Sequence, residues 1–424
     1  MPLRSRSPSP GATDAAVPAS GARPGTEQLR RQNLLAVLSS LRLHGSMSHT
    51  DLSSLTGLAS ATVTALTADL EKLGAIAREE QTVAGLRGRP RVLFSRAAGF
   101  AHVVAVQISS DALHYALSDF RGTLIDRFSM PRDAMGKRPD GFLAEIGTAL
   151  ARLLQRSRLQ PSAIALLSLS SKGIVDGEEG RLIWSPVFGR EQVDFSPLLA
   201  LYPEAALDVG NETLLVAQAL SRRRLSNPQG SESFSGLVAL SLGHSIGLGI
   251  ARQDTPGGPL SVSAPNFGHM LNTVDNRLCR CGAYGCVEAT AGFYGILRLA
   301  FQVPENTIPA KFVPLSEMEK IATAARQSNR MAQYAFRQAG LTLGQGLSRV
   351  LSLAGNLPVA ITGPGTRFYD LLKAGMEEGL NQSLHVRLNG LPVIETILDE
   401  QALVFEGHLD RALTAVDERL TASR

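Results

Sequence analysis

The sequence feature that most narrows the possible structures of this chain is a cluster of three cysteines that follows a Gly-His pair. Cys279, Cys281 and Cys286 are the only cysteines among the 424 residues, and Gly268-His269 precedes them. Three thiols and one imidazole form a tetrahedral ligand set for Zn²⁺, and the lack of a fifth ligand predicts a closed, structural site. An odd, clustered set also argues against structural disulfides. The sequence therefore predicts a zinc site here, with a cluster of free thiols as the alternative.

The basic residues are concentrated in the N-terminal part of the chain. Residues 1–96 hold 12 Lys and Arg against 7 Asp and Glu, whereas the net charge of the whole chain is +4. This imbalance favours a polyanionic partner for that part alone, although a solubilising basic segment is the alternative. Residues 1–25 are expected to form a disordered leader without a signal-peptide core. No apolar run reaches the length of about 18 residues that a membrane helix needs, so we expect a cytoplasmic protein.

Residues 26–96 have the pattern of a winged helix-turn-helix. A first helix is expected from about Thr26 to Gly45, where glycine ends the apolar repeat. Ser48 and Asp51 predict a capping box that opens a short second helix ending at Gly57. The apolar positions expected on these two helices are Leu29, Leu34, Leu38, Leu41, Leu52 and Leu55.

A third helix is expected to start at a cap formed by Ser60 and to end at Gly74. Val63, Leu66 and Leu70 recur at helical spacing and should face the core. The outward face then carries small side chains, which can approach base edges or phosphates closely. The residues expected to contact DNA on this helix are Ser60, Ala61, Thr62, Thr64 and Ala65.

A basic hairpin follows the third helix. Strands are expected at 75–80 and 92–95, around a loop that carries Arg87, Arg89 and Arg91. Guanidinium groups on such a wing can enter a narrow, A·T-rich minor groove. The order of helices, turn and hairpin predicts binding to double-stranded DNA. A helical oligomerisation module with an incidental basic loop is the alternative.

From residue 102 onward the pattern is that of an α/β fold. Short β-branched and apolar runs alternate with helical segments, of which 142–158 and 211–224 are the clearest. After the strand 236–241 and a Gly-rich hairpin that follows it, the chain is expected to be mainly helical. The expected strands are 103–108, 113–119, 163–169, 205–209, 236–241 and 359–362, and a further break in the helical pattern falls at 386–396.

The segment Phe267–Glu288 resembles the signature of the ROK family, named for repressors, open-reading-frame proteins and sugar kinases. From about Glu27 the chain is similar to the family's repressors of the xylose-repressor type, and residues 85–92, GLRGRPRV, stand where those repressors carry a Gly-Arg-Arg-Pro segment. The resemblance implies a two-lobed actin-like ATPase fold for residues 101–424, assembled as a homodimer or homotetramer. It places lobe 1 at about 101–215 plus the C-terminal helix, and lobe 2 at about 216–400.

The residues of the family's kinases are only partly kept. Their Asp-x-Gly-Gly-Thr phosphate loop corresponds to residues 107–111, QISSD, which lack the acid and both glycines. Their Gly-Thr-Gly-Ile-Gly loop corresponds to 243–247, GHSIG, and their catalytic Asp corresponds to Glu212, while the adenosine-side motif is kept in outline at 362–366. Phosphoryl transfer depends on positioned loops and a positioned base. We therefore expect a degenerate kinase with no catalytic residues, in which ATP is not a cofactor.

A polar ligand set remains in the cleft that the resemblance implies. Asn266 stands where the kinases have a sugar-binding Glu. His269 matches the histidine of the kinases and is also one of the predicted zinc ligands. Carboxylates, amides and an imidazole suit a polyhydroxy ligand, so we expect a sugar or sugar derivative. An empty relic with structural polar contacts is the alternative. The expected ligand-binding residues are Asn211, Glu212, Asn266, His269 and Glu288.

These features together predict a DNA-binding transcriptional regulator, acting as a repressor of sugar-related genes. Its kinase-like domain would sense a small polyhydroxy effector. Two alternatives stay open from the sequence. The first is an active ATP-dependent sugar kinase with an appended DNA-binding domain, and the second is a constitutive DNA-binding protein whose larger domain serves only for dimerisation.

Overall fold

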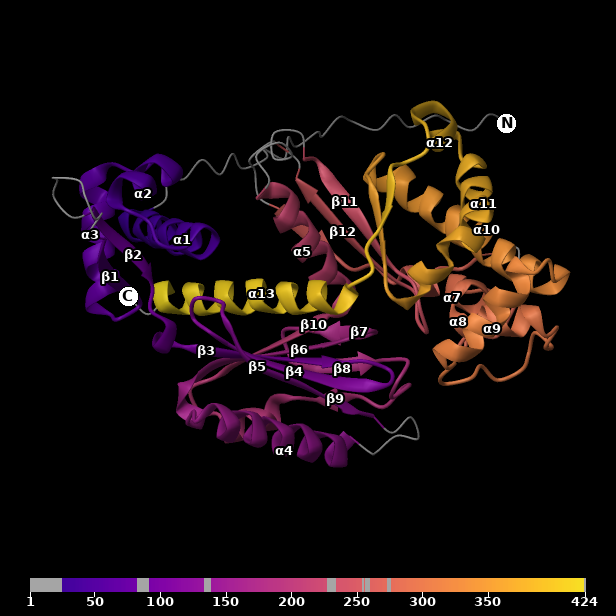
Figure 1. Cartoon of the computed structure of the whole chain (residues 1–424), viewed down its shortest axis with the longest axis horizontal. Coiled ribbons are helices and arrows are strands. Elements are labelled where there is room, and N and C mark those ends of the chain that lie inside the picture. The colour runs from indigo at the N-terminus through magenta and orange to yellow at the C-terminus, as the bar shows by residue number, and fades with distance from the viewer. Residues whose placement is uncertain are drawn as a thin grey trace, which may run out of the picture.

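The computed structural model describes residues 25–81, 91–132, 139–226, 234–253, 255, 260–272 and 276–422. Figure 1 shows a small N-terminal unit and two larger α/β units, with the long C-terminal helix α13 (Glu400–Ala422) among them. Within the described ranges, every helix is too short or too polar to cross a lipid bilayer.

The N-terminal unit consists of three helices and an antiparallel hairpin, in the predicted order. Its elements are α1 (Thr26–His44), α2 (His49–Thr56), α3 (Ser60–Lys72), β1 (Ile76–Gln81) and β2 (Arg91–Arg96). The predicted capping box opens α2, because the Ser48 hydroxyl accepts from the Asp51 N–H while the Asp51 carboxylate accepts from the Ser48 N–H. The left-handed Gly57 then ends this helix, so the turn before α3 is as expected.

Three details of this unit differ from the sequence prediction. The N-cap of α3 is Ala59 rather than Ser60, and no side chain caps the helix, because Ser60 is already its first helical residue. Leu29 and Leu55, two of the apolar positions expected on these helices, are 49% and 54% exposed. Leu29 precedes Leu34 by five residues, which turns it about 140° away around the helix.

The first α/β unit is built on a five-stranded sheet of order β10-β6-β3-β4-β5. Its strands are β3 (His102–Ile108), β4 (Ala112–Asp119), β5 (Leu124–Pro131), β6 (Ile164–Ser171) and β10 (Ala206–Asn211). β3, β4 and β5 pair antiparallel, whereas β6 and β10 extend the sheet in parallel. α4 (Pro139–Ser157) packs against this sheet through the same core. A small antiparallel sheet follows β6 and contains β7 (Ile174–Asp176), β8 (Arg181–Trp184) and β9 (Val193–Asp194).

The second α/β unit repeats this topology in a sheet of order β13-β12-β11-β14-β15. Its strands are β11 (Gly236–Ser241), β12 (Gly247–Gln253), β13 (Leu260–Ser263), β14 (Val359–Thr362) and β15 (Ile394–Thr396), of which the first three are antiparallel neighbours. β14 and β15 then continue in parallel. Its helices are α5 (Glu212–Leu225), α7 (Val287–Ala291), α8 (Phe293–Ala300), α9 (Leu315–Arg326), α10 (Arg330–Ala354), α11 (Tyr369–Asn381) and α12 (Leu384–Asn389). This duplicated sheet confirms the predicted α/β class and agrees with the expected two-lobed fold.

Several parts of the body depart from the sequence prediction. The break expected at 386–396 is smaller, because Val386 lies inside α12 and only Ile394–Thr396 pairs as a strand. The small sheet of β7, β8 and β9 and the edge strands β5 and β13 were not predicted. The exposed faces of β5 and β13 weaken the apolar runs that mark a strand.

Candidate functional site: a polar cleft beside a histidine–cysteine cluster

His269, Cys279, Cys281 and Cys286 come together in one cluster. Their ligand atoms all lie within 4.8 Å of one another. The Nδ1 of His269 is 3.6 Å from the Sγ of Cys279, and the sulfur atoms of Cys281 and Cys286 are 3.7 Å apart. Two sulfur atoms bound to one Zn²⁺ at about 2.3 Å in a tetrahedron lie about 3.8 Å apart. These two separations are close to those expected around a tetrahedral metal ion, and the four predicted residues could together hold one.

Two glycines allow the cysteine knuckle, residues 279–286, to turn this tightly. Gly282 and Gly285 have φ angles of 90° and 79°, which residues with a side chain rarely adopt. The backbone N–H of Cys279 also donates to the carbonyl oxygen of Ala283 at 2.8 Å. A hydrogen bond from Cys286 is the main cause that lowers the pKa of Cys279. A lowered pKa favours the thiolate, the form that binds a metal cation.

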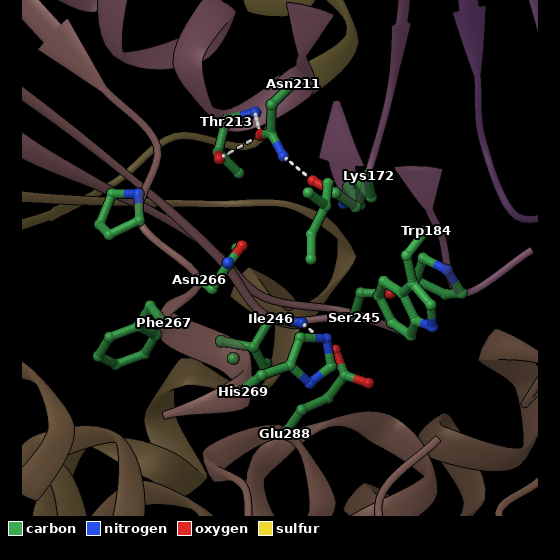
Figure 2. Close-up of a pocket in the computed structure, with 16 residues that line it drawn as sticks. Lys172, Trp184, Asn211, Thr213, Ser245, Ile246, Asn266, Phe267, His269 and Glu288 are labelled. Atoms are coloured by element: carbon green, nitrogen blue, oxygen red, sulfur yellow. Dashed lines mark hydrogen bonds between the residues drawn. The ribbon is translucent and has the colours of Figure 1, made fainter. Parts of the chain in front are cut away.

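Four of the five predicted ligand-binding residues line a single pocket. Asn211, Asn266, His269 and Glu288 all line this pocket, whose cavity volume is about 40 Å³. Figure 2 shows Asn211 on one side of this pocket and His269 beside Glu288 on the other. Because these polar groups come from different elements, they can bind several hydroxyl groups of one ligand.

Asn211 also holds the start of α5 in place. Its Oδ1 accepts hydrogen bonds from the backbone N–H and the hydroxyl of Thr213, at 2.8 and 2.6 Å. Its Nδ2 donates to the carbonyl oxygen of Gly173 at 2.6 Å. One hydrogen of the Asn211 amide group is left for a ligand. The residue is therefore both a helix cap and a wall of the pocket.

Glu288 connects the pocket to the loop before β12. Its buried carboxylate accepts a hydrogen bond from the Ile246 N–H at 3.1 Å. Burial raises the pKa of Glu288, while the nearby charges of Arg280 and His269 oppose the rise. Gly268 makes this packing possible, because a Cβ atom there would collide with the carbonyl oxygen of Ile246. Glu288 thus fixes the loop that forms the pocket floor.

Glu212 does not line this pocket but a neighbouring hollow, which it shares with Lys172 and Glu400. It is 1% exposed, and its oxygens form no regular hydrogen bond with a described residue, although Gln107 lies nearby as a weak donor. Burial raises the pKa of Glu212 to about 7; the Lys172 charge opposes this rise and the Glu400 charge adds to it. The five-residue ligand set is therefore divided between two adjacent compartments.

Three further residues belong to the cleft and were not predicted from the sequence. Lys172 and Ser245 line both compartments, and the Ser245 hydroxyl is buried without a hydrogen-bond partner among the described residues. The indole of Trp184 meets the His269 ring edge-on, with centroids 4.7 Å apart. Lys172 follows the carboxyl end of a buried strand, where ligand-binding residues are common in α/β folds. That position was the signal available in the sequence.

The segments that correspond to the kinase loops line the second compartment. Residues 107–111 comprise the end of β3 and the tight turn 109–111 to β4, which is closed by a hydrogen bond from the Ser109 N–H to the carbonyl oxygen of Ala112 at 3.0 Å. In the loop 243–247, the ring of His244 stacks on Phe312 at 4.4 Å between centroids. Burial lowers the pKa of His244 to about 4, so this imidazole is neutral at neutral pH. Ser109, Ser110 and His244 thus place their side chains along this compartment.

The predicted DNA-contacting residues of α3 lie on its outer face. Ser60, Ala61, Thr64 and Ala65 are exposed and Thr62 is partly exposed, while Val63, Leu66 and Leu70 are buried. The Thr64 hydroxyl donates to the carbonyl oxygen of Ser60 at 2.9 Å. Arg87 and Arg89 lie outside the described residues, and Arg91 is the first residue of β2.

Known proteins share this architecture. The model of the ROK family matches residues 103–404. The chain belongs to the ROK family. It is 22% identical to a xylose repressor of Caldicellulosiruptor bescii over 383 residues, which covers 89% of this chain and 94% of that protein.

Two solved structures show the same fold over most of their length. A ROK family transcriptional regulator, described as a homologue of the Escherichia coli Mlc protein, has a TM-score of 0.71 and 21% identity, covering 93% of this chain and 98% of its own. A Streptomyces griseus ROK glucokinase in complex with glucose and AMPPNP has a TM-score of 0.53 and 20% identity, covering 74% of this chain and 99% of its own. The family therefore contains both regulators and kinases.

Proposed function

We propose that this ROK protein is a DNA-binding transcriptional repressor of sugar-related genes, with a sugar or sugar derivative as its effector. The observation that carries the proposal is the outer face of α3, the third helix of the N-terminal unit. Small side chains line this face. Such a face can approach DNA bases closely. The relative named xylose repressor, which matches along 89% of this chain, supports the same role.

The mechanism we propose is a shift between two arrangements of the α/β units. The polar residues of the cleft bind the effector, and the body, as a homodimer or homotetramer, presents two or more N-terminal units to an operator. The effector can change operator affinity only through its different affinity for the two arrangements. The Ser245 hydroxyl has no hydrogen-bond partner among the described residues, and the Asn211 amide has one hydrogen left to donate. Both groups support binding of a ligand's hydroxyl groups in the cleft.

We propose Zn²⁺ as the ion held by the histidine–cysteine cluster. Three thiols and one imidazole match the preference of Zn²⁺ for sulfur and nitrogen ligands, and the ion would have a structural role. His269 faces the cluster with its Nδ1, which leaves its Nε2 for the cleft. The knuckle and the pocket would thus share one side chain.

Operator binding can be tested by gel shift with the DNA upstream of the protein's own gene. Thr64→Glu adds a negative charge to the proposed DNA face, and we expect it to abolish the sequence-selective, salt-sensitive complex. Thr148→Glu on α4 is the matched control, because both threonines are exposed helical residues that donate to the carbonyl four residues earlier at 2.9 Å. Equal DNA affinity of the two variants would reject the proposed face.

A sugar kinase is the competing function, favoured by the carboxylate that Glu212 keeps beside the cleft. We expect no turnover above about 1 s⁻¹, the low end of ordinary enzyme rates, in a coupled assay with ATP, magnesium and a panel of hexoses, amino sugars and polyols. Turnover that disappears in Glu212→Gln would establish the kinase instead.

A constitutive DNA-binding protein is the other competitor, and ligand binding separates it from a regulated repressor. A sugar at 100 times its Kd should stabilise the folded protein by about 2.7 kcal/mol. The same sugar panel, screened by thermal unfolding, should raise the Tm for at least one member and lose this effect in Asn266→Leu. A Tm that no sugar changes would favour the constitutive protein.

A further inference from the structure

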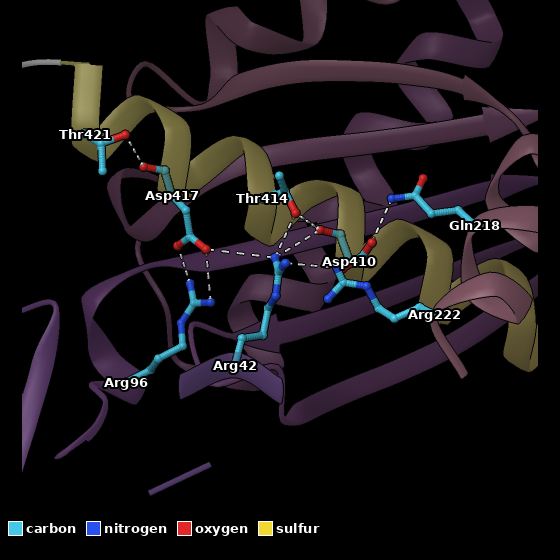
Figure 3. A network of polar contacts seen from close by, with 8 residues as sticks. All are labelled: Arg42, Arg96, Gln218, Arg222, Asp410, Thr414, Asp417 and Thr421. Carbon is cyan, nitrogen blue, oxygen red and sulfur yellow. Dashed lines mark hydrogen bonds and ion pairs between the residues drawn. The ribbon is translucent and has the colours of Figure 1, made fainter. Parts of the chain in front are cut away.

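A buried ionic network joins the N-terminal unit to the body. The Arg96 guanidinium binds both carboxylate oxygens of Asp417, at 3.2 and 2.6 Å. Arg42 donates to the Thr414 hydroxyl at 2.8 Å and lies 3.4 Å from Asp410. The exposed fractions of Arg96, Asp417 and Asp410 are 2%, 3% and 7%. Figure 3 shows both arginines of the N-terminal unit reaching α13.

The same network reaches α5 through one shared aspartate. The Asp410 carboxylate accepts from the Gln218 amide at 2.7 Å and lies 2.7 Å from Arg222. Both residues belong to α5, so Asp410 is bound at once by the N-terminal unit and by the second α/β unit. A bidentate or multiply bonded carboxylate fixes the geometry of its partners more narrowly than an exposed pair does.

The opposite ends of α5 and α13 lie at the cleft. Glu212 and Glu400 are the first residues of these helices, and both line the second compartment. The Lys172 ammonium group is 3.4 Å from the Glu400 carboxylate, and the Thr362 hydroxyl donates to that carboxylate at 3.0 Å. A ligand that engages Lys172 in either compartment therefore competes with the contact that holds the start of α13.

The two helices are packed too closely to slide independently. Gly407 of α13 lies against the backbone of Leu215 in α5, where a Cβ atom would collide with the carbonyl oxygen. α13 is also bound to β6, because the His408 ring lies 2.8 Å from the hydroxyls of both Ser168 and Ser170. A displacement of α5 or α13 at the cleft therefore moves both helices along their length, since packed helices have few alternative arrangements.

We propose that Asp410 and Asp417 are positioning residues that lock the DNA-binding unit onto α13, and that the α5–α13 pair couples this lock to Lys172 in the cleft. The proposal rests on the proposed function, to which it adds the residues that carry regulation. An effector that draws Lys172 away from Glu400 weakens the lock and frees the N-terminal unit to change its orientation. Coupling of this kind is reciprocal, so weakening the lock also loosens the cleft end.

Hydrogen exchange of the full chain tests this coupling without an operator or an effector. Asp417→Asn should raise the exchange rates of α1 and α3 about tenfold or more, because it leaves the Arg96 charge buried and unpaired. Lys172→Met, at the other end of α13, should raise the same rates about threefold or more. In the double variant the two effects should not multiply, since residues of one network act together.

Matched variants distinguish coupling from simple loss of stability. Glu406→Gln removes the exposed Arg223–Glu406 pair between the same two helices and should leave exchange of α1 and α3 unchanged. If Lys172→Met does not fold, Glu400→Gln takes its place. The proposal is overturned if the cleft variant leaves α1 and α3 unchanged, or if the two effects simply multiply. Because the readout needs no DNA, a protein that failed to bind an operator could still show this coupling.

Discussion

At the scale of single residues, Glu212 is a buried carboxyl group whose charge state changes near neutral pH. Burial raises its pKa from the ordinary 4.5 to about 7, which corresponds to about 3 kcal/mol against the ionised form in the folded protein. A raised folded pKa means that the stability due to this group is fully present below pH 4.5. That stability is lost as the pH rises through 7, because the buried carboxylate must then ionise.

Glu212→Gln should therefore stabilise the protein at high pH and not at low pH. The amide keeps the shape of the carboxyl group and has no charge to bury beside Glu400. We expect the free energy of unfolding to rise by a few kcal/mol at pH 8, with little change at pH 5, in urea titrations at both values. An equal gain at pH 5 and pH 8 would show that shape or hydrogen bonding, not ionisation, causes the effect.

The sequence predicted those site residues that carry a local signal. His269 and the three cysteines stand within a short segment, and Asn211 stands at a strand–helix junction. Lys172 and Glu400 are separated by 228 residues, so their contact depends on a fold that brings two units together. The division of Glu212 from the other ligand residues follows from that same arrangement and has no sequence signal.

At the scale of elements, the cysteine knuckle should act as a brace for the cleft. Arg280, inside the knuckle, donates to the carbonyl oxygen of His244 at 2.9 Å. Cys286→Ser or chelation should remove the proposed zinc ion, lower the free energy of unfolding by a few kcal/mol and speed hydrogen exchange of the loop 243–247. Metal content by atomic spectroscopy and exchange by mass spectrometry check both effects.

Tyr284→Phe is the matched control for the knuckle, since Tyr284 is 47% exposed and is not a ligand. It should keep equimolar zinc and wild-type exchange. A wild-type protein that contains no zinc after purification in zinc-supplemented buffer would contradict the metal assignment itself.

The sequence predicted the start of a helix correctly where a side chain caps that helix. The Ser48–Asp51 capping box fixed the start of α2 correctly. The start of α3 was misplaced by one residue, because Ala59 adopts the extended N-cap conformation without any side-chain hydrogen bond. Such a cap leaves no signature in the sequence, and tertiary packing rather than capping decides where the helix begins.

At the scale of the whole molecule, α13 joins three parts of the chain that the sequence separates widely. It packs against α1 of the N-terminal unit, α5 of the second α/β unit, and β3 and β6 of the first. The resemblance to the ROK family implied a C-terminal helix beside lobe 1 but not its central place, because neither α5 nor Arg42 and Arg96 lie near it in sequence. We therefore expect the three units to unfold as one cooperative body.

Gly407→Ala should break that cooperativity. A single methyl group at this position meets the Leu215 backbone, so α13 must move away from α5, at a cost of about 1 to 3 kcal/mol. Gly147→Ala in α4 is the matched control: its methyl meets only the Leu201 side chain, at 3.3 Å, and alanine favours a helix. Calorimetry should show one unfolding transition for the wild type and the control, and a separate, earlier transition of the N-terminal unit in Gly407→Ala. A single transition shifted as a whole would instead mean that the lock on α13 holds without close packing of the helix pair.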